Sequence, residues 1–317
     1  MRVFPPPVWL GAALLASSLL VPGGEAAGAA KMRGVLLSIT NYTPVLIARD
    51  KGWFAEEGLD VSWTLVAQGA LSVEAVYGGS AEFGGSSIFE PLVARGNGLD
   101  ILYVVGSARL PQQPPDNTAM LVRADDAIRS PKDLGGKTVS AGLINSVNYI
   151  HTQFWLRKHG VDPKTVRFLE VPFPQMNDAL LRHRIDAAFN VEPFVSAAMA
   201  TGKARSLGHP YLENIPGMDI THYIAKETWV KANADAMRRF KRAVDRATQF
   251  LSAAPKAERN QWIAKYTGMD VNIVAGVNLP IFTTEINPET IKKNLDLAVE
   301  SKLVNQPFDV ATMIWKP

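Results

Sequence analysis

The chain has 317 residues, 47% hydrophobic and 20% charged, which is ordinary for a globular protein long enough to form two packed domains. Its net charge of +3 is small, and its densest basic run, Arg238, Arg239, Lys241 and Arg242, is interpreted as a solvated helix face. No nucleic-acid partner is therefore predicted. The chain has no cysteine, which excludes disulfides, thiol catalysis, cysteine-bound metal and a lipid-modified N-terminal cysteine.

The first 29 residues have the pattern of a secretory signal peptide. Arg2 supplies a positive charge, Val8 to Val21 form an apolar segment, and Ala27-Gly28-Ala29 is a small-residue cleavage site. The apolar segment is short for a bilayer span, although a retained membrane anchor stays open as the alternative. We therefore expect a free periplasmic protein that is not a lipoprotein.

From residue 34 onward, apolar runs alternate with helix-start signals. The sequence predicts strands near 34–39, 59–66, 83–85 and 100–107, with helices starting near Thr43, Ser72 and Ser87. Thr43-Pro44 is a typical helix start, and Gly52 suits the left-handed position that ends a helix. Strands that alternate with helices are typical of a mostly parallel sheet with helices on its faces.

A second run of the same type follows. Strands are predicted near 138–141, 166–171, 186–189 and 204–207, and helices near 147–158, 175–182 and 195–201. Extended segments near 118–124 and 218–226 are interpreted as two hinge crossings. The predicted fold is α/β with two lobes, the first formed by residues 30–120 and 222–317 and the second by residues 121–221. The C-terminal part is predicted to be helical and to cover mainly the first lobe.

The two halves share a local pattern. Phe83 is followed by Glu90-Pro91, and Phe189 is followed by Glu192-Pro193, so in both halves a short strand runs into Glu-Pro at a helix start. The spacing differs by a few residues. An internal repeat that gives two similar lobes is therefore a hypothesis at this point.

Catalytic and metal-binding patterns are not found. The five histidines (151, 159, 183, 209 and 222) show no metal-ligand spacing, and no nucleophile elbow, Walker loop or dinucleotide fingerprint occurs. Gly84-Gly85-Ser86-Ser87 lacks the glycine that a nucleophile elbow needs after its serine. We therefore predict no catalytic residue, no metal site and no cofactor.

A ligand site is better supported, because the loops after parallel strands meet in one crevice. The candidates are polar or small residues in those loops. They are Thr40, Asn41, Tyr42, Gln68, Gly69, Ser86 and Ser87 in the first lobe, and Asn145, Ser146, Asn148, Asn190 and Glu192 in the second. The alternative for each Ser and Asn is that it only caps its own helix.

Several of these motifs resemble a known family. Tyr42, Pro44, Lys51-Gly52-Trp53-Phe54, Glu57-Gly58-Leu59-Asp60-Val61, Ser130-Pro131 and Glu192-Pro193 occur in the order found in the solute-binding proteins of ABC importers of the nitrate, sulfonate and taurine class. The resemblance implies a type II periplasmic binding protein fold, a monomer, a small-molecule solute and a permease partner in the inner membrane. In pyrimidine-binding members an acidic residue at the Glu192 position receives ligand amino groups.

The resemblance also shows where this chain departs. The family usually has a tryptophan before Glu-Pro, whereas this chain has Val191, so Tyr42, Phe89, Tyr149 or Phe189 is expected to stack on the ligand instead. Only Arg109 is an obvious cation for an anionic ligand. Glu90 and Glu192 argue against an anion and favour an aromatic or heterocyclic solute.

The expected function is capture of a small organic solute by hinge closure, with sulfonates and nitrate still open as ligands. The alternatives are an exported enzyme on the same fold and the ligand-sensing partner of a membrane receptor.

Overall fold

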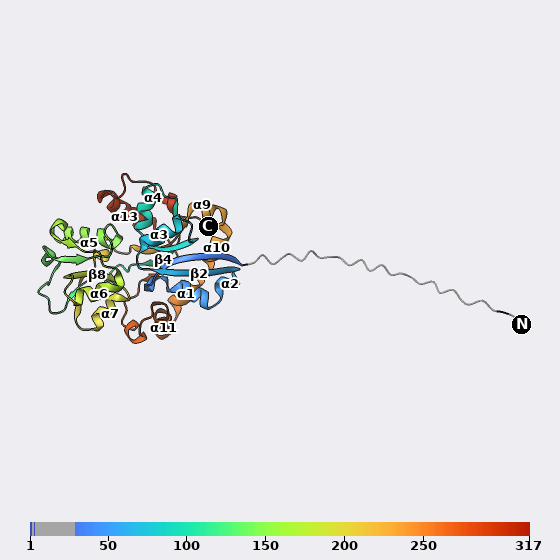
Figure 1. Ribbon diagram of the computed structural model, residues 1–317, viewed down its shortest axis with the longest axis horizontal. Helices are drawn as coiled ribbons and strands as arrows, with labels where there is room; N and C mark the ends of the chain where they lie inside the picture. The colour runs from blue at the N-terminus through green and yellow to red at the C-terminus, as the bar shows by residue number, and fades with distance from the viewer. Residues whose placement is uncertain (2, 4–28) are drawn as a thin grey trace.

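The computed structural model describes Met1, Val3 and residues 29–317, and it contains two mixed sheets flanked by helices (Figure 1). The predicted signal peptide lies outside the described residues, apart from Met1, Val3 and Ala29. Within the described part of the chain, no helix has the length and apolar character needed to cross a membrane.

The first sheet has six strands in the order β11-β4-β10-β3-β1-β2. Its elements are β1 (Ala30–Leu37), η1 (Thr40–Tyr42), α1 (Thr43–Asp50), α2 (Trp53–Glu56), β2 (Leu59–Val66), α3 (Gly69–Tyr77), β3 (Phe83–Ser87), α4 (Glu90–Gly96), β4 (Ile101–Arg109), β10 (Asp219–Lys226) and β11 (Ile281–Phe282). Strands β2, β1 and β3 are parallel, and β10 lies antiparallel between β3 and β4. Residues 30–109 and 219–317 are called the first lobe below.

The second sheet has five strands in the order β7-β6-β8-β5-β9. Its elements are β5 (Thr118–Arg123), η2 (Pro131–Leu134), β6 (Thr138–Ser140), α5 (Val147–Lys158), η3 (Pro163–Thr165), β7 (Arg167–Phe168), α6 (Phe173–Leu181), β8 (Ala187–Val191), α7 (Phe194–Ala200), β9 (Ala204–Gly208) and α8 (Pro210–Asn214). Residues 118–214 are called the second lobe.

The two sheets share a strand arrangement. In the first, β10 pairs antiparallel with β3, and β3, β1 and β2 follow in parallel. In the second, β5 pairs antiparallel with β8, and β8, β6 and β7 follow in parallel. The segments that end in Glu-Pro follow β3 and β8, which occupy equivalent places. This is the arrangement that the repeat hypothesis anticipates.

The segments expected to cross between the lobes are placed differently in the structure. Strand β5 pairs only within the second sheet and β10 only within the first, because each fills the gap between two strands of its own sheet. The chain passes between the lobes at residues 110–117 and 215–218, just before these strands. The two connections lie side by side, since the Leu110 amide donates to the Met218 carbonyl at 2.8 Å.

The C-terminal part comprises α9 (Glu227–Ala232), α10 (Ala234–Ala253), α11 (Lys256–Thr267), α12 (Val271–Val274), α13 (Pro288–Glu300) and η4 (Val310–Met313). Helix α10 packs on the first lobe, where the Phe240 ring lies 5.4 Å from that of Phe54 and 4.7 Å from that of Phe83. Two other helices reach the second lobe. Helix α12 contacts α7, and Asn294 of α13 bonds His151 of α5 at 3.0 Å, so the tail also joins the lobes.

Candidate functional site

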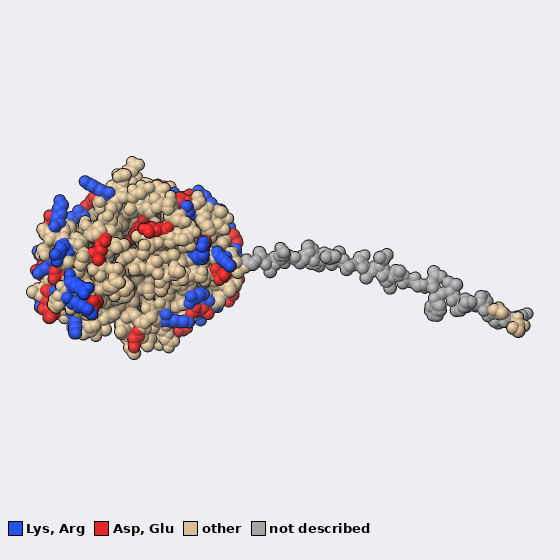
Figure 2. Space-filling view, viewed as in Figure 1, with Lys and Arg blue, Asp and Glu red and all other residues tan. Residues whose placement is uncertain are grey.

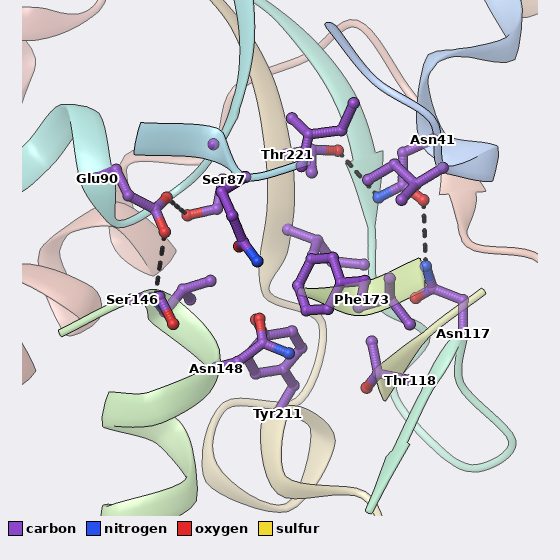
Figure 3. A pocket seen from close by; sticks show the side chains of 17 residues that line it. Asn41, Ser87, Glu90, Asn117, Thr118, Ser146, Asn148, Phe173, Tyr211 and Thr221 are labelled. Atoms are coloured by element: carbon purple, nitrogen blue, oxygen red, sulfur yellow. Dashed lines mark hydrogen bonds between the residues drawn. The ribbon is translucent and has the colours of Figure 1, made fainter. Parts of the chain in front are cut away.

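A small cavity lies between the lobes at the carboxyl ends of six parallel strands, three from each sheet (Figure 3). It has a volume of about 40 Å³. Its walls are formed by Leu37, Ile39, Asn41, Gln68, Gly69, Ser87, Glu90, Ile220 and Thr221 of the first lobe, by Thr118, Ser146, Val147, Asn148, Phe173, Val191 and Tyr211 of the second, and by Asn117 of a connection. This edge of α/β sheets is where such folds bind ligands.

The first-lobe wall is built from the turns after β1, β2 and β3. Asn41 lies in η1, directly after β1, and Gln68 precedes α3. Ser87 ends β3, where its hydroxyl accepts the Phe89 amide at 2.8 Å and donates to the carboxylate of Glu90. Glu90 is the first residue of α4, so the strand-to-helix turn places its side chain at the cavity.

The second-lobe wall is built from helix starts. Ser146 caps α5, because its hydroxyl accepts the Tyr149 amide at 3.4 Å, and Asn148 lies in the first turn of the same helix. The Tyr211 hydroxyl of α8 donates to Asn148 Oδ1 at 2.5 Å. Phe173, the first residue of α6, completes this wall with an aromatic face.

Hydrogen bonds lie on both sides of the cavity, and one of them, from Val147 to Glu90, joins the two lobes directly. Asn117 Nδ2 donates to Asn41 Oδ1 at 3.2 Å, and Asn41 Nδ2 donates to Thr221 Oγ1 at 3.1 Å (Figure 3). On the other side of the cavity, the Val147 amide donates to Glu90 Oε1 at 3.3 Å. The lobes are therefore in contact around the cavity, which explains its small volume.

Among the described residues that line the cavity, Glu90 is the one acidic side chain. Burial raises the pKa of the Glu90 carboxyl above its usual value of 4.5, although the bonds from Ser87 and Val147 oppose this shift. Among the described residues that line the cavity there is no Lys, Arg or His. Arg109, the cation expected for an anionic ligand, instead forms an ion pair with Asp219 at 2.5 Å and does not line the cavity.

Two polar atoms of buried lining residues have no hydrogen-bond partner in the described part of the chain. They are the Gln68 Nε2 donor and the Asn117 Oδ1 acceptor, on side chains that are 6% and 1% exposed. Buried polar groups are nearly always paired, so an unpaired donor and acceptor beside a cavity are typical of a ligand site.

An outer groove of about 290 Å³ adjoins the cavity. Gln68, Gly69, Glu90 and Ser146 line both spaces. The rest of the groove is lined by Ala70, Val73, Glu74, Val93 and Ala94 from α3 and α4, and by Leu143, Ile144 and Asn145 from the loop before α5. The groove is larger than the cavity, its lining is also mainly apolar, and it opens to solvent.

The structure brings seven of the twelve predicted site residues to these two spaces. Asn41, Gln68, Gly69, Ser87, Ser146 and Asn148 line the cavity, and Asn145 lines the outer groove. Thr40, Tyr42, Ser86, Asn190 and Glu192 line neither. Of these, Thr40 donates to Asn41 Oδ1, Ser86 donates to the Gly69 carbonyl, and Asn190 donates to Asn177 Oδ1.

Tyr42 and Glu192 require a correction, because they were expected on opposite walls. Tyr42 is fully buried behind β3, where its hydroxyl donates to the Ser86 carbonyl at 3.0 Å. Glu192 is also fully buried and accepts hydrogen bonds from the Ser196 hydroxyl at 2.7 Å and the Ser196 amide at 3.0 Å. Both side chains are thus held in the protein interior rather than at the cavity.

The cavity residues that the predicted site did not include are, among others, Glu90, Asn117, Thr118, Phe173, Tyr211 and Thr221, although Glu90 was already expected to disfavour an anion. Glu90 carried a usable signal, since Glu-Pro after a strand is the same pattern that led to Glu192. Asn117 lies in a connection and Tyr211 in a five-residue helix, where no hydrophobic period exists to place a side chain. The expected stacking residues Phe89 and Phe189 are fully buried, and Phe173 and Tyr211 provide the aromatic faces instead.

The described residues contain no group of three or more His, Asp or Glu side chains placed to hold a metal ion.

Comparison with known protein families shows which family the chain belongs to. Residues 39–258 match the family described as NMT1/THI5 like, and this segment contains every residue that lines the cavity except Leu37. The chain belongs to this family. One relative of the chain is the taurine-binding periplasmic protein of Escherichia coli. It is 23% identical over 245 residues, which is 75% of this chain and 74% of that one. A 4-amino-5-hydroxymethyl-2-methylpyrimidine phosphate synthase of Saccharomyces cerevisiae is 20% identical over 236 residues, 70% of this chain and 66% of its own.

A solved structure confirms the predicted fold of this family member. The periplasmic aliphatic sulphonate binding protein SsuA of Escherichia coli matches with a TM-score of 0.75 and 20% identity over 90% of this chain and 97% of that one. The periplasmic binding protein fold is therefore shown. The taurine-binding periplasmic relative supports a solute-binding role and a periplasmic location.

Proposed function

We propose that the protein is the substrate-binding component of an ABC importer and that it holds a small organic solute between its lobes. The observation that carries this proposal is the cavity lined from both lobes, at the carboxyl ends of three strands from each sheet. Membership of the NMT1/THI5 like family supports it. The partner would be a permease in the inner membrane, and the protein would act as a monomer.

Capture is proposed to occur by closure of the lobes about the connections at 110–117 and 215–218. A solute that contacts both walls stabilises the closed arrangement, because only there are all its contacts made. The Glu90–Val147 bond joins the two lobes, so it is a contact that closure would form. Small-angle scattering should show a smaller radius of gyration with ligand than without it, and an unchanged radius would contradict closure.

The proposed solute class is aromatic or heterocyclic. Phe173 and Tyr211 offer apolar faces, and the lining supplies no basic side chain from the described residues. The relatives are named for taurine and for aliphatic sulphonate, so sulfonates and nitrate belong in any test of this class.

A thermal-shift screen against pyrimidines, aromatic carboxylates, sulfonates and nitrate tests the function. A ligand at a hundredfold excess over its dissociation constant should raise the free energy of unfolding by about 2.7 kcal/mol. Gln68→Ala should reduce this shift with little change in the ligand-free melting temperature, because its Nε2 atom has no protein partner. Gln175→Ala, an exposed position on α6, is the matched control. Equal responses from the two variants would show that the cavity is not the site.

Incubation of the protein with a compound that binds in the screen separates binding from catalysis. A bound compound recovered from the protein after incubation should have an unchanged mass. A new product would favour the exported enzyme on the same fold, and with it a role closer to that of the pyrimidine phosphate synthase relative.

A further inference from the structure

Two acidic residues and an apolar groove set the chemistry of the candidate site. Glu90 lies where the cavity meets the groove, and Glu74 lies on the groove wall. Neither space has a basic residue among the described residues that line it. Figure 2 shows acidic side chains beside the central hollow of this face, whereas Lys and Arg gather toward the two ends of the molecule. A cation approaching the site is thus attracted and an anion is repelled.

The start of α5 gives the second reason to expect a cation. A helix N-terminus usually favours an anion, because its free amides point outward. Here the first amide of this twelve-residue helix, that of Val147, already donates to the Glu90 carboxylate. An anionic ligand would have to displace Glu90 and would then lie beside its charge.

The two volumes give the third reason, because they restrict the shape of the ligand. The cavity of about 40 Å³ holds only a small group of atoms, whereas the groove of about 290 Å³ holds several times as much. Since the two spaces share four lining residues, one molecule can occupy both. Val73, Ala70 and Ile144 make the outer part apolar, and Ile144 is 41% exposed when the groove is empty.

We infer that the ligand is an organic cation with a small nitrogen-containing head and an apolar tail. The protonated nitrogen lies at Glu90 and donates to its carboxylate. The head fills the cavity, where Asn117 Oδ1 accepts a further N–H and Gln68 Nε2 donates to an acceptor of the head or to a water held with it. The tail lies in the groove against Val73 and Ile144. This inference rests on the proposed solute-binding function and names the solute class within it.

The test compares compounds that share one carbon skeleton and differ in the head. 2-Phenylethylamine, 2-phenylethanol and 2-phenylethanesulfonate are titrated into the full-length protein at pH 7 and followed by calorimetry. The amine should bind at least tenfold more tightly than the alcohol or the sulfonate. Tighter binding of the sulfonate would overturn the inference while leaving the solute-binding function intact. Failure of the amine to bind would also overturn it, and the broader screen described above would then test the function separately.

Two variants with matched controls locate the groups. Glu90→Gln should bring the affinity for the amine close to that for the alcohol, whereas Glu285→Gln, an exposed glutamate in the loop before α13, should keep the tenfold preference. Ile144→Ser should weaken the amine severalfold, whereas Leu71→Ser, which is 44% exposed on α3 and outside the groove lining, should not. Methylamine has no tail, so its binding should be insensitive to Ile144→Ser. A preference that survives Glu90→Gln would refute the role of Glu90, and equal effects of the two serine variants would refute the groove.

Discussion

The two Glu-Pro segments occupy equivalent places in the two sheets, yet their carboxylates have different surroundings and different hydrogen-bond partners. Both follow a strand that lies between a parallel and an antiparallel neighbour. Glu90 lines the cavity and bonds Ser87 and the Val147 amide. Glu192 is buried away from the cavity and bonds Ser196 of its own helix.

The difference follows from the position of each glutamate relative to the helix start. Helix α4 begins at Glu90 itself, whereas α7 begins at Phe194, two residues after Glu192. A carboxylate placed just before a helix can fold back on the free amides of its first turn, and Glu192 does so at the Ser196 amide. Glu90 starts its helix and reaches instead to the first amide of a helix in the other lobe.

Each carboxylate also accepts a hydrogen bond from an amide of the opposite lobe. Glu90 accepts from Val147 at 3.3 Å, and Glu192 accepts from Asn278 after α12 at 3.4 Å. Both carboxylates therefore contact the opposite lobe, but only Glu90 also lines the cavity. Variants at Glu90 should change ligand affinity, whereas variants at Glu192 should mainly change stability.

The largest expected effect is the pH dependence of stability caused by Glu192. Burial raises the pKa of Glu192 to about 7, above the usual value of 4.5. The folded state then holds a proton that the unfolded state has lost, so the free energy of unfolding should fall as pH rises between these values. The full loss, reached above pH 7, is up to about 3 kcal/mol at 1.36 kcal/mol per pKa unit.

Urea unfolding of the wild type and of Glu192→Gln from pH 4 to pH 8 measures this effect. Other groups also make stability depend on pH, such as His209, whose pKa the hydrogen bond to Asp116 raises, so the difference between the two proteins is the informative quantity. That difference should change by up to about 3 kcal/mol in favour of the variant as pH rises. Parallel curves would show that Glu192 does not titrate in this range.

Ser196→Ala should have the second largest effect. It removes the hydroxyl that donates to Glu192 at 2.7 Å and leaves a buried carboxylate with fewer donors. A hydrogen bond to a charged group contributes about 1.5–3 kcal/mol, so we expect a loss of about 2 kcal/mol at pH 8. The loss should shrink at pH 5, where Glu192 is protonated. A loss independent of pH would mean that the hydroxyl only fills space.

The sequence predicted the fold because hydrophobic period and helix-start signals are local. Helix α5 runs from Val147 to Lys158 as expected, and Met237, Phe240, Val244, Ala247 and Leu251 form the predicted buried stripe of α10. Both signals depend on residues a few positions apart, so they can be recognised without knowledge of the tertiary structure.

The cavity could be predicted only in part, for a physical reason. Loops after strands were expected to converge, and Asn41, Gln68, Ser87 and Asn148 do so. Which way a side chain turns in such a loop depends on contacts from distant segments. Tyr42 turns inward because β3 has a glycine beside its ring, where a Cβ at Gly85 would come within 2.5 Å of it. A one-residue or two-residue shift of a helix start, as at Glu192, is below what sequence patterns resolve.

Ser87→Ala is expected to have the smallest effect on stability, and it sharpens the comparison from the cavity side. The Ser87 hydroxyl donates to Glu90 and accepts the Phe89 amide. Glu90 is only partly buried, whereas Glu192 is fully buried, so water replaces the bond to Glu90 more easily than the bond from Ser196 to Glu192. The loss should be about 1 kcal/mol or less, roughly half of that for Ser196→Ala.

Ligand binding should reverse the order of the two serine variants. Ser87 orients the carboxylate that faces the cavity, so Ser87→Ala should weaken a ligand that contacts Glu90 severalfold, whereas Ser196→Ala should leave the affinity within about twofold once the protein is folded. Calorimetric titration of both variants with the tightest compound of the screen measures this. If Ser196→Ala weakened the ligand more than Ser87→Ala, the closed arrangement of the lobes, held in part through Glu192 and Asn278, would control affinity more than the cavity wall does.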